Sequence, residues 1–538
     1  MDNFLRESRE SAEGIDLAVR TEAGVDTGLD TLEPVVSGGG SEPETDRDPP
    51  APVAAAQRPM PHKEVRTIVL SLMVAMFLTA LDQTIVATAL PTIGRQFHNV
   101  ADLSWVITAY LLSSTSVAPV FGSLSDIYGR RTMMMAALGL FLVGSVACAL
   151  APSILVLVVA RFLQGLGGGG ILPLVQTVLA DIITPRERAR YQAFFSMVWV
   201  TAGVGGPVLG GVIAEHLHWS VIFWVNVPLV LLALVVLMPR LKRLPAHHRP
   251  RKLDWGGGLL LMAAAMAFLL VLTWGGNLLP WQSPQLLGLA GLVLLLAGVF
   301  VRHARRVAEP FLPLGLLTGP VVPLAFTAAA CAIGTMVGLT VQLPIYYEAV
   351  YHLSASQAGF ALIPIVALSV PGATAAGRVM MHMKHYKWIA MVGLSTGAIA
   401  SLLLAIATPL PLWQLLVLLS VAALGLGTTF PVTVVSVQSA VARHQIGTVT
   451  GAMNFFRSLM AAVTVALFTA ILLASLGGGA ASLDQLDLTA TPSADMVTAF
   501  RYVFFAAAAL LGIGALAIVG MLERPLGDGP RPHVEIGE

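Results

Sequence analysis

The chain is poor in charge and in cysteine. Only 11% of its 538 residues are Asp, Glu, Lys or Arg, where a soluble domain carries about 25%, and the mean hydropathy is +0.79. A soluble protein of this size cannot withdraw so much apolar surface from water, so the composition excludes a soluble enzyme, a disordered chain and a collagen-like chain. The two cysteines, Cys148 and Cys331, both lie in apolar runs, which excludes a disulfide scaffold and a cysteine-based zinc cluster.

The sequence also lacks the motifs of nucleotide and metal chemistry. The glycine run Gly167–Gly170 is not followed by the Lys and Ser/Thr that complete a phosphate-binding loop, and no H-E-x-x-H occurs. We therefore expect no nucleotide, no metal ion, no other cofactor and no catalytic residue. With a net charge of +1, nucleic acid is not an expected partner either.

The small net charge hides an uneven distribution. Residues 1–60 hold 13 acidic residues and 5 arginines, a net charge of −8, whereas residues 61–538 hold 26 basic and 17 acidic residues, a net charge of +9. The first 60 residues are rich in Gly, Ser, Pro and acids and contain no apolar run of signal-peptide length. We therefore expect a disordered acidic cytoplasmic tail and not a targeting segment.

Long uncharged runs fill the rest of the chain. A membrane-spanning helix needs about 20 apolar residues, and the runs 255–301 and 388–442 are each long enough for two such helices around a Gly- or Pro-containing turn. Dividing all runs in this way predicts an all-α membrane protein of fourteen transmembrane helices. The predicted helices start near Arg66, Asp102, Arg131, Ser153, Tyr191, Val221, Trp255, Gln285, Val321, Ala355, Trp388, Leu412, Gly447 and Phe500.

The positions of the basic residues support this count, because cytoplasmic loops carry an excess of Lys and Arg. With a cytoplasmic N-terminus, the loops after even-numbered helices hold 18 Lys and Arg, while the opposite loops hold Arg95, with Arg501 at the mouth of the last helix. A wrong helix count would break this alternation, so both termini are predicted to be cytoplasmic. The 18 residues are Arg130, Arg131, Arg186, Arg188, Arg190, Arg240, Lys242, Arg243, Arg249, Arg251, Lys252, Arg302, Arg305, Arg306, Arg378, Lys384, Lys387 and Arg443.

Three charged residues fall inside predicted helices: Asp82, Arg161 and Arg457. A charge within hydrocarbon is costly and often marks a transport pathway or a proton relay. Counting about 1.5 Å per residue places Asp82 and Arg161 at a similar depth, so we expect them to pair or to share an aqueous cavity. The residues alone leave open whether such a pair is a proton relay or a structural link. For Arg457 we expect a contact with backbone carbonyls of a neighbouring helix, with a bound substrate, or with water reached by snorkelling.

Four ordered motifs in helices 1 to 5 resemble one family. Leu81–Pro91 reads LDQTIVATALP, Gly122–Arg131 reads GSLSDIYGRR, Arg161–Gly167 reads RFLQGLG and Gly203–Gly211 reads GVGGPVLGG. They are similar to that family's helix-1 motif L-D-x-T-[IV]-V-x-x-A-L-P, its loop 2–3 motif G-x-L-x-D-x-x-G-R-[RK], its helix-4 motif R-x-x-Q-G-x-G and its glycine-proline motif of helix 5. The family is the major facilitator superfamily, in particular its fourteen-helix drug:proton antiporter branch of multidrug efflux transporters.

This resemblance implies the major facilitator fold, in which two six-helix halves surround a substrate path, here with two inserted helices. The implied segments are the acidic tail 1–60, an N-terminal half 64–240, a linker 241–310 with inserted helices 7 and 8, a C-terminal half 311–523 and a cytoplasmic tail 524–538. The second half departs from the first, because Gly377–Met381 lacks the acid that Asp126 supplies. Some relatives that accept divalent cationic drugs have an acidic residue in helix 10, whereas helix 10 here, about 355–377, has none. The resemblance therefore favours monovalent or neutral lipophilic substrates over divalent cations.

The resemblance also implies roles for individual residues. Asp82 would carry the proton, and Arg161 would respond to its charge. The cytoplasmic gate would consist of Gly122, Asp126, Gly129, Arg130 and Arg131, and the close-packed face of helix 5 of Gly203, Gly206, Pro207, Gly210 and Gly211. Candidates for the substrate cavity are Trp105, Tyr110, Trp199, Asn454, Phe455 and Arg457.

The implied function is that of a proton-coupled secondary antiporter. It would export small lipophilic compounds or drugs across the plasma membrane, in a bacterial inner membrane, by alternating access. Its partners would be the small lipophilic substrate, protons and membrane lipid, and we expect a monomer. Two alternatives remain open: a dedicated exporter of an endogenous metabolite or lipid on the same fold and, more remotely, a polytopic membrane enzyme.

Overall fold

A computed structural model of the chain describes residues 62–97, 102–241, 254–276, 278–383, 385–476 and 493–523. These residues form helices joined by short connections, without a β-strand. The predicted tails 1–60 and 524–538 lie outside the described residues. So do six of the basic loop residues: Lys242, Arg243, Arg249, Arg251, Lys252 and Lys384.

Helices of membrane-spanning length and composition make up most of the described ranges. Thirteen helices are long and apolar enough to cross a membrane, and a shorter apolar helix, Val221–Leu237, adds one more. The predicted starts of helices 2–4 and 6–13 agree with the structure within one residue. Two of these stretches are divided into shorter helices, Val221–Leu237 into α7 and α8 and Gln357–His382 into α12, α13 and α14. The α-helices of the described ranges are α2 (His62–Phe97), α3 (Leu103–Tyr128), α4 (Arg130–Ala149), α5 (Ile154–Ile182), α6 (Pro185–His216), α7 (Val221–Trp224), α8 (Asn226–Leu241), α9 (Trp255–Trp274), α10 (Pro284–Ala304), α11 (Val322–Tyr351), α12 (Ala355–Ala361), α13 (Ile363–Ala367), α14 (Ser369–His382), α15 (Lys387–Ala407), α16 (Leu412–Ala440), α17 (Ile446–Ser475) and α18 (Ser493–Gly520).

Two predicted helix starts are wrong, each by six or seven residues: helix 5 begins at Pro185 and not near Tyr191, and the last helix begins at Ser493 and not near Phe500. Helix 5 starts early because Thr184 and Glu187 form a capping box, in which each side chain accepts the other residue's backbone N–H, with Pro185 at the first helical position. Arg186, Arg188 and Arg190, which the sequence predicts in a loop, therefore lie in the first turns of the helix.

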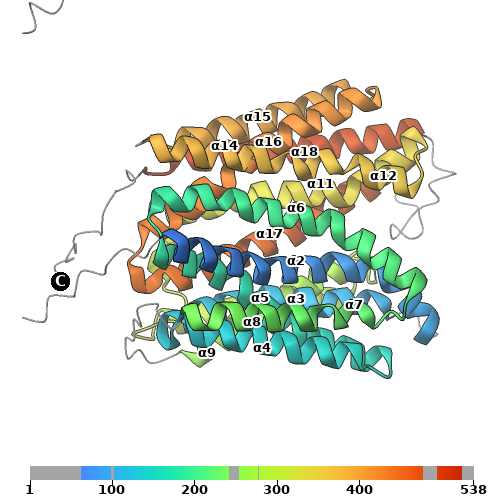
Figure 1. Ribbon diagram of the computed structural model, residues 1–538. Coiled ribbons are helices and arrows are strands. Elements are labelled where there is room, and N and C mark those ends of the chain that lie inside the picture. The colour runs from blue at the N-terminus through green and yellow to red at the C-terminus, as the bar shows by residue number, and fades with distance from the viewer. Residues whose placement is uncertain are drawn as a thin grey trace, which may run out of the picture. The chain divides into compact units, whose positions relative to one another are not determined.

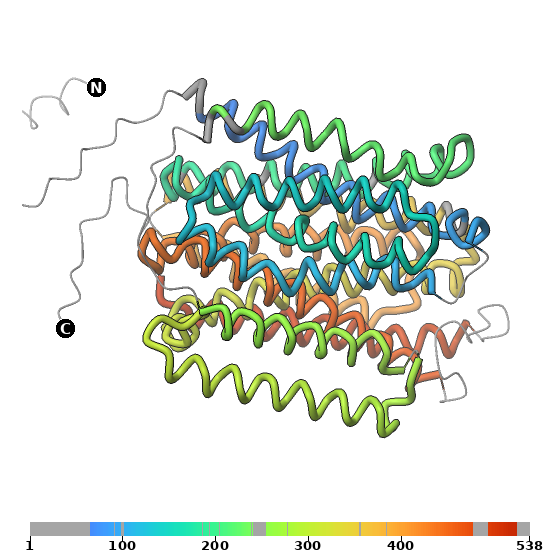
Figure 2. The backbone as a smooth tube through the Cα atoms, turned by 90° about the horizontal axis from the view of Figure 1, so that it is seen from below, coloured from blue at the N-terminus to red at the C-terminus, as the bar shows by residue number. Residues whose placement is uncertain are grey.

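The helices form two groups, which correspond to the two predicted halves of the chain. In the first half, α5 packs against α3 and α4, and α2 packs against α6 and α8. In the second half, α15 packs against α16 and α18, α11 against α17 and α18, and α14 against α16 (Figure 1). The halves meet where α3 packs against α17 and where α6 packs against α14. The inserted helices α9 and α10 pair with each other along one flank, where α9 also contacts α3 and α17 (Figure 2).

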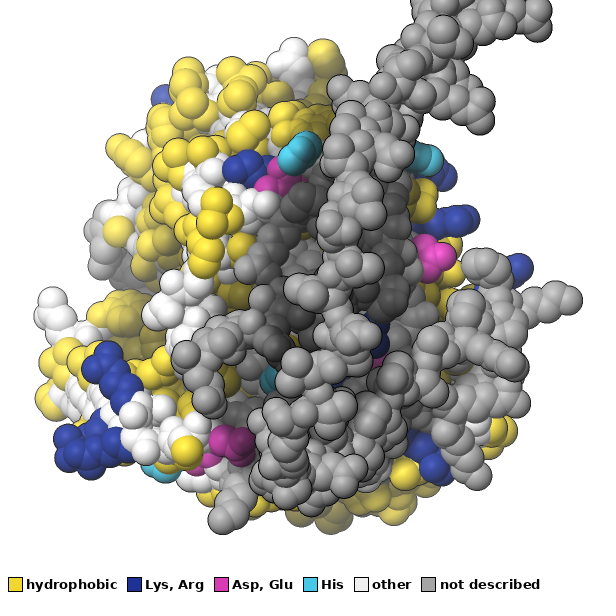
Figure 3. Space-filling model, turned by 90° about the vertical axis from the view of Figure 1, so that its left-hand side faces the viewer, with side chains coloured by type: hydrophobic (Ala, Val, Ile, Leu, Met, Phe, Trp, Pro, Cys, Tyr) yellow, Lys and Arg dark blue, Asp and Glu magenta, His cyan; other side chains and the backbone are white. Residues whose placement is uncertain are grey.

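Hydrogen bonds near helix ends identify the two ends of the helix bundle. At one end, the carboxyl-terminal part of α3 meets the amino terminus of α17, and the amino terminus of α15 meets the residues that follow α18. We call this the basic end, because the described residues of the predicted basic loops are attached there; Figure 3 shows it with Lys and Arg around its rim. At the opposite end, Trp219 donates to Gln96 and Arg501 donates to the carbonyl of Thr408.

Candidate functional site

Asp82 lies at the centre of a buried polar network in the first half. Its Oδ2 is 2.6 Å from Arg161 Nη1, and its Oδ1 accepts hydrogen bonds from Gln164 at 2.9 Å and from Asn226 at 2.8 Å. Gln164 in turn donates to Ser145 at 2.9 Å. All five side chains are essentially closed to solvent; Asp82 itself is 0% exposed. Asp82 and Arg161, which the sequence places at a similar depth in the membrane, therefore form an ion pair.

This network connects four helices. Asp82 comes from α2, Arg161 and Gln164 from α5, Ser145 from α4 and Asn226 from α8. The guanidinium of Arg161 also donates to the carbonyl of Val106 in α3 and lies 4.3 Å from the ring centre of Tyr110. A change in the charge of Asp82 would alter the hydrogen bonds that hold these helices, because a neutral carboxyl cannot accept three charge-assisted bonds equally well.

Asp126 links the two halves at the basic end. It lies near the end of α3, and its carboxylate accepts the backbone N–H groups of Gly447 at 3.0 Å and Thr448 at 2.7 Å, as well as the Thr448 hydroxyl at 2.9 Å. Gly447 and Thr448 belong to the first turn of α17, whose own preceding residue, Gln445, provides no side-chain cap. A carboxylate from one half thus caps a helix of the other half and faces the positive end of its dipole.

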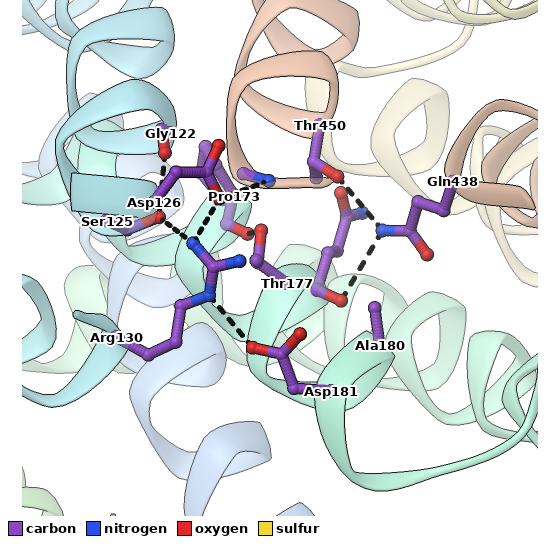
Figure 4. A network of polar contacts seen from close by, with 12 residues as sticks. Gly122, Ser125, Asp126, Arg130, Pro173, Thr177, Ala180, Asp181, Gln438 and Thr450 are labelled. Atoms are coloured by element: carbon purple, nitrogen blue, oxygen red, sulfur yellow. Dashed lines mark hydrogen bonds and ion pairs between the residues drawn. The ribbon is translucent and has the colours of Figure 1, made fainter. Parts of the chain in front are cut away.

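Arg130 holds this carboxylate in place from within the first half. It pairs with Asp126, donates from Nε to Asp181 of α5 at 2.9 Å and from Nη1 to Ser125 at 2.8 Å (Figure 4). Arg131, the neighbouring residue of the predicted gate, has a buried Nε without a partner within the described ranges. Asp126 and Arg130 therefore both take part in the contact between α3 and α17, whereas Arg131 forms no hydrogen bond there within the described ranges.

At two positions of the loop 2–3 motif, the path of the backbone accommodates only glycine without strain. A Cβ on Gly122 would clash with the carbonyl oxygen of Gly447 and lie 3.0 Å from the Cα of Gly451, so only glycine lets α3 and α17 approach this closely. Gly129, between α3 and α4, has φ of 86°, in the left-handed region that glycine accommodates without strain.

The second half repeats the close approach but not the acid. Gly377 of α14 packs against the backbone of Ala189 and Arg190 in α6, as Gly122 packs against α17. The acid that the first half supplies is absent there. The amino terminus of α6 has its own cap in Thr184 and Glu187, so it does not need a carboxylate from the other half.

A second set of hydrogen bonds between the halves lies beside Asp126. Asn454 of α17 donates to the side chain of Gln176 in α5 at 2.8 Å, and Gln438 of α16 donates to the carbonyl of Gln176 at 3.4 Å. Within the second half, Gln438 also donates to Thr450 at 3.0 Å. Arg188 of α6 donates to Gln438 at 2.8 Å. Figure 4 shows Gln438 reaching toward α5 close to the Asp126–Arg130 pair. Sequence reasoning missed Gln176 and Gln438, although uncharged polar side chains within apolar helices were a visible signal.

The glycines of helix 5 divide into two sets. An added Cβ on Gly206 would lie 2.7 Å from Thr84 Cβ, and one on Gly210 would lie 2.7 Å from the carbonyl oxygen of Ile85, so both glycines allow α6 to contact α2 closely. Thr84 also donates across this contact to the carbonyl of Ala202 at 2.9 Å. Gly203 and Gly211 of the same motif face open space, and Pro207 is exposed within an unbroken helix.

The residues predicted to line a common substrate cavity lie in different environments. Tyr110 packs under Arg161, and Asn454 belongs to the contacts between the halves. Phe455 is buried beside Phe456, and Trp199 is exposed on α6. Arg457 donates to the hydroxyl of Thr433 at 3.1 Å, so its partner is a side chain of α16 and not a backbone carbonyl.

An apolar cavity of about 380 Å³ lies between α3, α5 and the inserted helix α9. Trp105, from the sequence-based candidates, lines it and packs edge-on against Trp274 with ring centres 5.9 Å apart. Phe162 and Ala109 also line this cavity, next in sequence to Arg161 and Tyr110 of the buried network. The cavity and the buried network are thus formed by neighbouring residues of the same two helices, α3 and α5.

Other chemistry finds no support in the described ranges. No group of three or more His, Cys, Asp or Glu is placed to hold a metal ion there. Gly393–Gly397 reads G-x-S-x-G, but it lies inside the continuous helix α15 and not at a strand-to-helix turn, so it does not form a nucleophile elbow.

Asp254 joins the two inserted helices outside the membrane-spanning segments. It caps α9 through the N–H of Gly257 at 2.8 Å, accepts the N–H of Phe311 at 3.0 Å and lies 2.7 Å from His303 Nε2 of α10. Burial raises the pKa of this carboxyl, but the hydrogen bonds from His303, Gly257 and Phe311 outweigh it and leave the pKa below its ordinary value.

The arrangement is that of a helical membrane protein with two halves, which are joined by hydrogen bonds at one end and of which the first contains a buried ion pair. Residues 72–465 match the family described as the Major Facilitator Superfamily, and the chain belongs to this superfamily of transporters. It is 30% identical to Multidrug resistance protein 3 of Bacillus subtilis over 403 residues, covering 74% of this chain and 78% of that protein. It is 32% identical to Efflux pump FUS6 of Gibberella fujikuroi over 405 residues, covering 73% of each.

The fold is also that of solved members of the superfamily. The proton:xylose symporter XylE superposes with a TM-score of 0.57 at 16% identity, over 86% of this chain and 98% of that one. At this identity the likeness concerns the fold alone. The chain is an integral membrane transporter with efflux pumps among its relatives, as the motifs of helices 1 to 5 predict.

Proposed function

We propose that this chain is a proton-coupled antiporter that exports small lipophilic compounds across the plasma membrane, driven by the proton gradient without a nucleotide or other cofactor. The observation that carries the proposal is the Asp82–Arg161 pair, a carboxylate fully closed to solvent and bonded to three donors on two other helices. Such a carboxylate exchanges a proton only when the surrounding helices move, which is the coupling that an antiporter requires.

The contacts between the halves support alternating access. The hydrogen bonds of Asp126, Gln176 and Gln438 that cross between the halves all lie at the basic end, whereas the bonds named at the opposite end stay within one half. If the basic end is cytoplasmic, as the excess of Lys and Arg in its loops favours, this conformation is closed toward the cytoplasm. A bacterial inner membrane with both termini inside is part of the proposal.

The test is substrate-induced proton movement in proteoliposomes that contain a pH-sensitive dye. Addition of a panel of lipophilic compounds under an imposed pH gradient should produce a proton flux that is lost in Asp82→Asn. Glu215→Gln, which removes an exposed carboxylate at the far end of α6, should keep the flux and serves as the matched control. Full substrate-driven flux in folded Asp82→Asn would overturn the proposal.

The single variant leaves Arg161 buried without its partner, which costs about 3–5 kcal/mol in typical proteins. The double variant Asp82→Asn/Arg161→Gln removes both charges and avoids this loss of stability. It should fold and also lack coupling. If no compound elicits flux in folded wild-type protein, the dedicated export of one endogenous metabolite or lipid becomes the better account.

A further inference from the structure

Arg457 is a buried cation without a carboxylate partner in the described part of the chain. Its side chain is 8% exposed, and it is the twelfth residue of the 30-residue helix α17, about 17 Å from the start of that helix at about 1.5 Å per residue. At this depth the side chain does not reach water beyond either helix end, so the snorkelling alternative is excluded. Its Nη2 donates to Thr433, while its Nε is buried and has no partner among the residues that the structure describes.

The contrast with Arg161 shows how unusual this environment is. Arg161 has a carboxylate at 2.6 Å, an acceptor in Gln164 at 2.7 Å and a backbone carbonyl at 3.2 Å. Arg457 has one hydroxyl at 3.1 Å and the ring of Phe430 at 5.8 Å. A buried cation is costly unless an anion and further acceptors compensate it. The guanidinium of Arg457 therefore retains most of its capacity to bind an anion.

Arg457 lies close to the contacts between the two halves. It lies one turn beyond Asn454, on the side away from the basic end, so it is just past the hydrogen bonds that close the two halves. On α16, one turn before Thr433, the hydroxyl of Thr429 is buried and has no hydrogen-bond partner within the described ranges. An incoming anion would thus find a guanidinium and a hydroxyl with unused hydrogen-bonding capacity, next to an aromatic ring.

We propose that Arg457 binds the acidic group of the transported compound, and that the substrate class is a lipophilic organic acid with a single carboxylate. This rests on the proposed export function, since it names the kind of compound that the same path carries. A planar guanidinium binds a carboxylate through two parallel hydrogen bonds. The hydrophobic part of the acid lies against apolar and aromatic side chains such as Phe430.

The test compares three pyrene derivatives that share one hydrophobic body: pyrenebutyrate, pyrenebutanol and pyrenebutyltrimethylammonium. Binding to the full-length protein in lipid nanodiscs is measured by energy transfer from tryptophan, with empty nanodiscs as the background. Wild-type protein should bind the acid at least about tenfold more tightly than the alcohol, as a charge-assisted hydrogen bond provides. The cation should bind more weakly than either.

Variants at position 457 separate binding of the acid from a structural role. In Arg457→Gln the affinities for the acid and the alcohol should become about equal, while the affinity for the alcohol stays within about twofold of the wild-type value. Arg457→Lys should keep part of the preference for the acid. Arg95→Gln, which removes an exposed arginine bonded to Thr92, is the matched control and should keep the full preference. A structural role alone would lower affinity for acid and alcohol together.

The proposal is overturned if wild-type protein shows no preference for the acid, or if Arg457→Gln keeps it. Because binding is measured without a proton gradient, these outcomes do not depend on the coupling role of Asp82. A protein that binds the acid through Arg457 but moves no protons would contradict antiport alone. One that moves protons with neutral or cationic compounds, with the preference absent, would contradict this inference alone.

Discussion

Replacement of Asp126 by Asn should open the basic end. Asn keeps the size of the side chain but removes the negative charge that pairs with Arg130 and faces the amino terminus of α17. A charge at a helix terminus contributes about 0.3–2 kcal/mol, and each of two backbone hydrogen bonds loses about 1 kcal/mol when its acceptor becomes neutral. The closed state should lose about 2–4 kcal/mol relative to the open one, or about 30- to 1000-fold in the equilibrium constant.

The distance between spin labels on α3 and before α17 measures this change. Tyr128 and Arg443 are exposed near the two helix ends that Asp126 connects, and the native cysteines, Cys148 and Cys331, are buried and can be replaced. Double electron–electron resonance on the labelled pair should give a narrow, short distance in wild-type protein and a longer population in Asp126→Asn.

Asp181→Asn is the matched control. It removes a carboxylate bonded to the same arginine but leaves the bonds from Asp126 to α17 intact, so the distances should change much less. An unchanged distance distribution in Asp126→Asn, or an equal change in both variants, would refute the idea that capping of α17 by the other half keeps this end closed.

Three further changes test the packing and capping contacts. Gly122→Ala should slow transport and lengthen the same spin-label distance, because its Cβ would clash with the backbone of α17. Gly139→Ala, whose Cβ would have no neighbouring atom within 4 Å, should change neither transport nor the distance. Gly210→Ala should lower the melting temperature by the equivalent of about 1–3 kcal/mol through overpacking against α2, while Gly211→Ala, facing open space, should leave it unchanged or raise it slightly. Asp254→Ala should lower stability by about 1 kcal/mol at neutral pH through loss of the cap. Because the folded-state pKa of Asp254 is below its ordinary value, its contribution is present above about pH 4 and fades below it, so the melting temperatures of wild type and variant should converge on acidification; a constant difference down to pH 3 would contradict this.

The sequence was sufficient for what depends on local composition. Uncharged runs of about 20 residues determine the helices, and the depth of Asp82 and Arg161 along their helices was enough to bring them together. The predicted start of helix 5, near Tyr191, is wrong because the capping box of α6, Thr184 and Glu187, lies in a charged stretch whose composition is typical of a loop.

Contacts between residues far apart in the chain could not be derived in this way. Asn226 completes the bonds to Asp82 from 144 positions away, and Gln438 meets the carbonyl of Gln176 across 262 positions. Both depend on how helices pack, which hydropathy does not encode. The same holds for Arg457, whose bond to Thr433 follows from the packing of α16 on α17.

The central claim, that the charge of Asp82 couples transport to protons, is tested most directly by comparing two reactions in the same vesicles. One is uphill efflux driven by a pH gradient, and the other is exchange of labelled for unlabelled substrate without any gradient. The account predicts that the double variant Asp82→Asn/Arg161→Gln retains exchange, because binding and alternating access survive, but loses uphill efflux. Uphill efflux at the wild-type rate in that variant would contradict it.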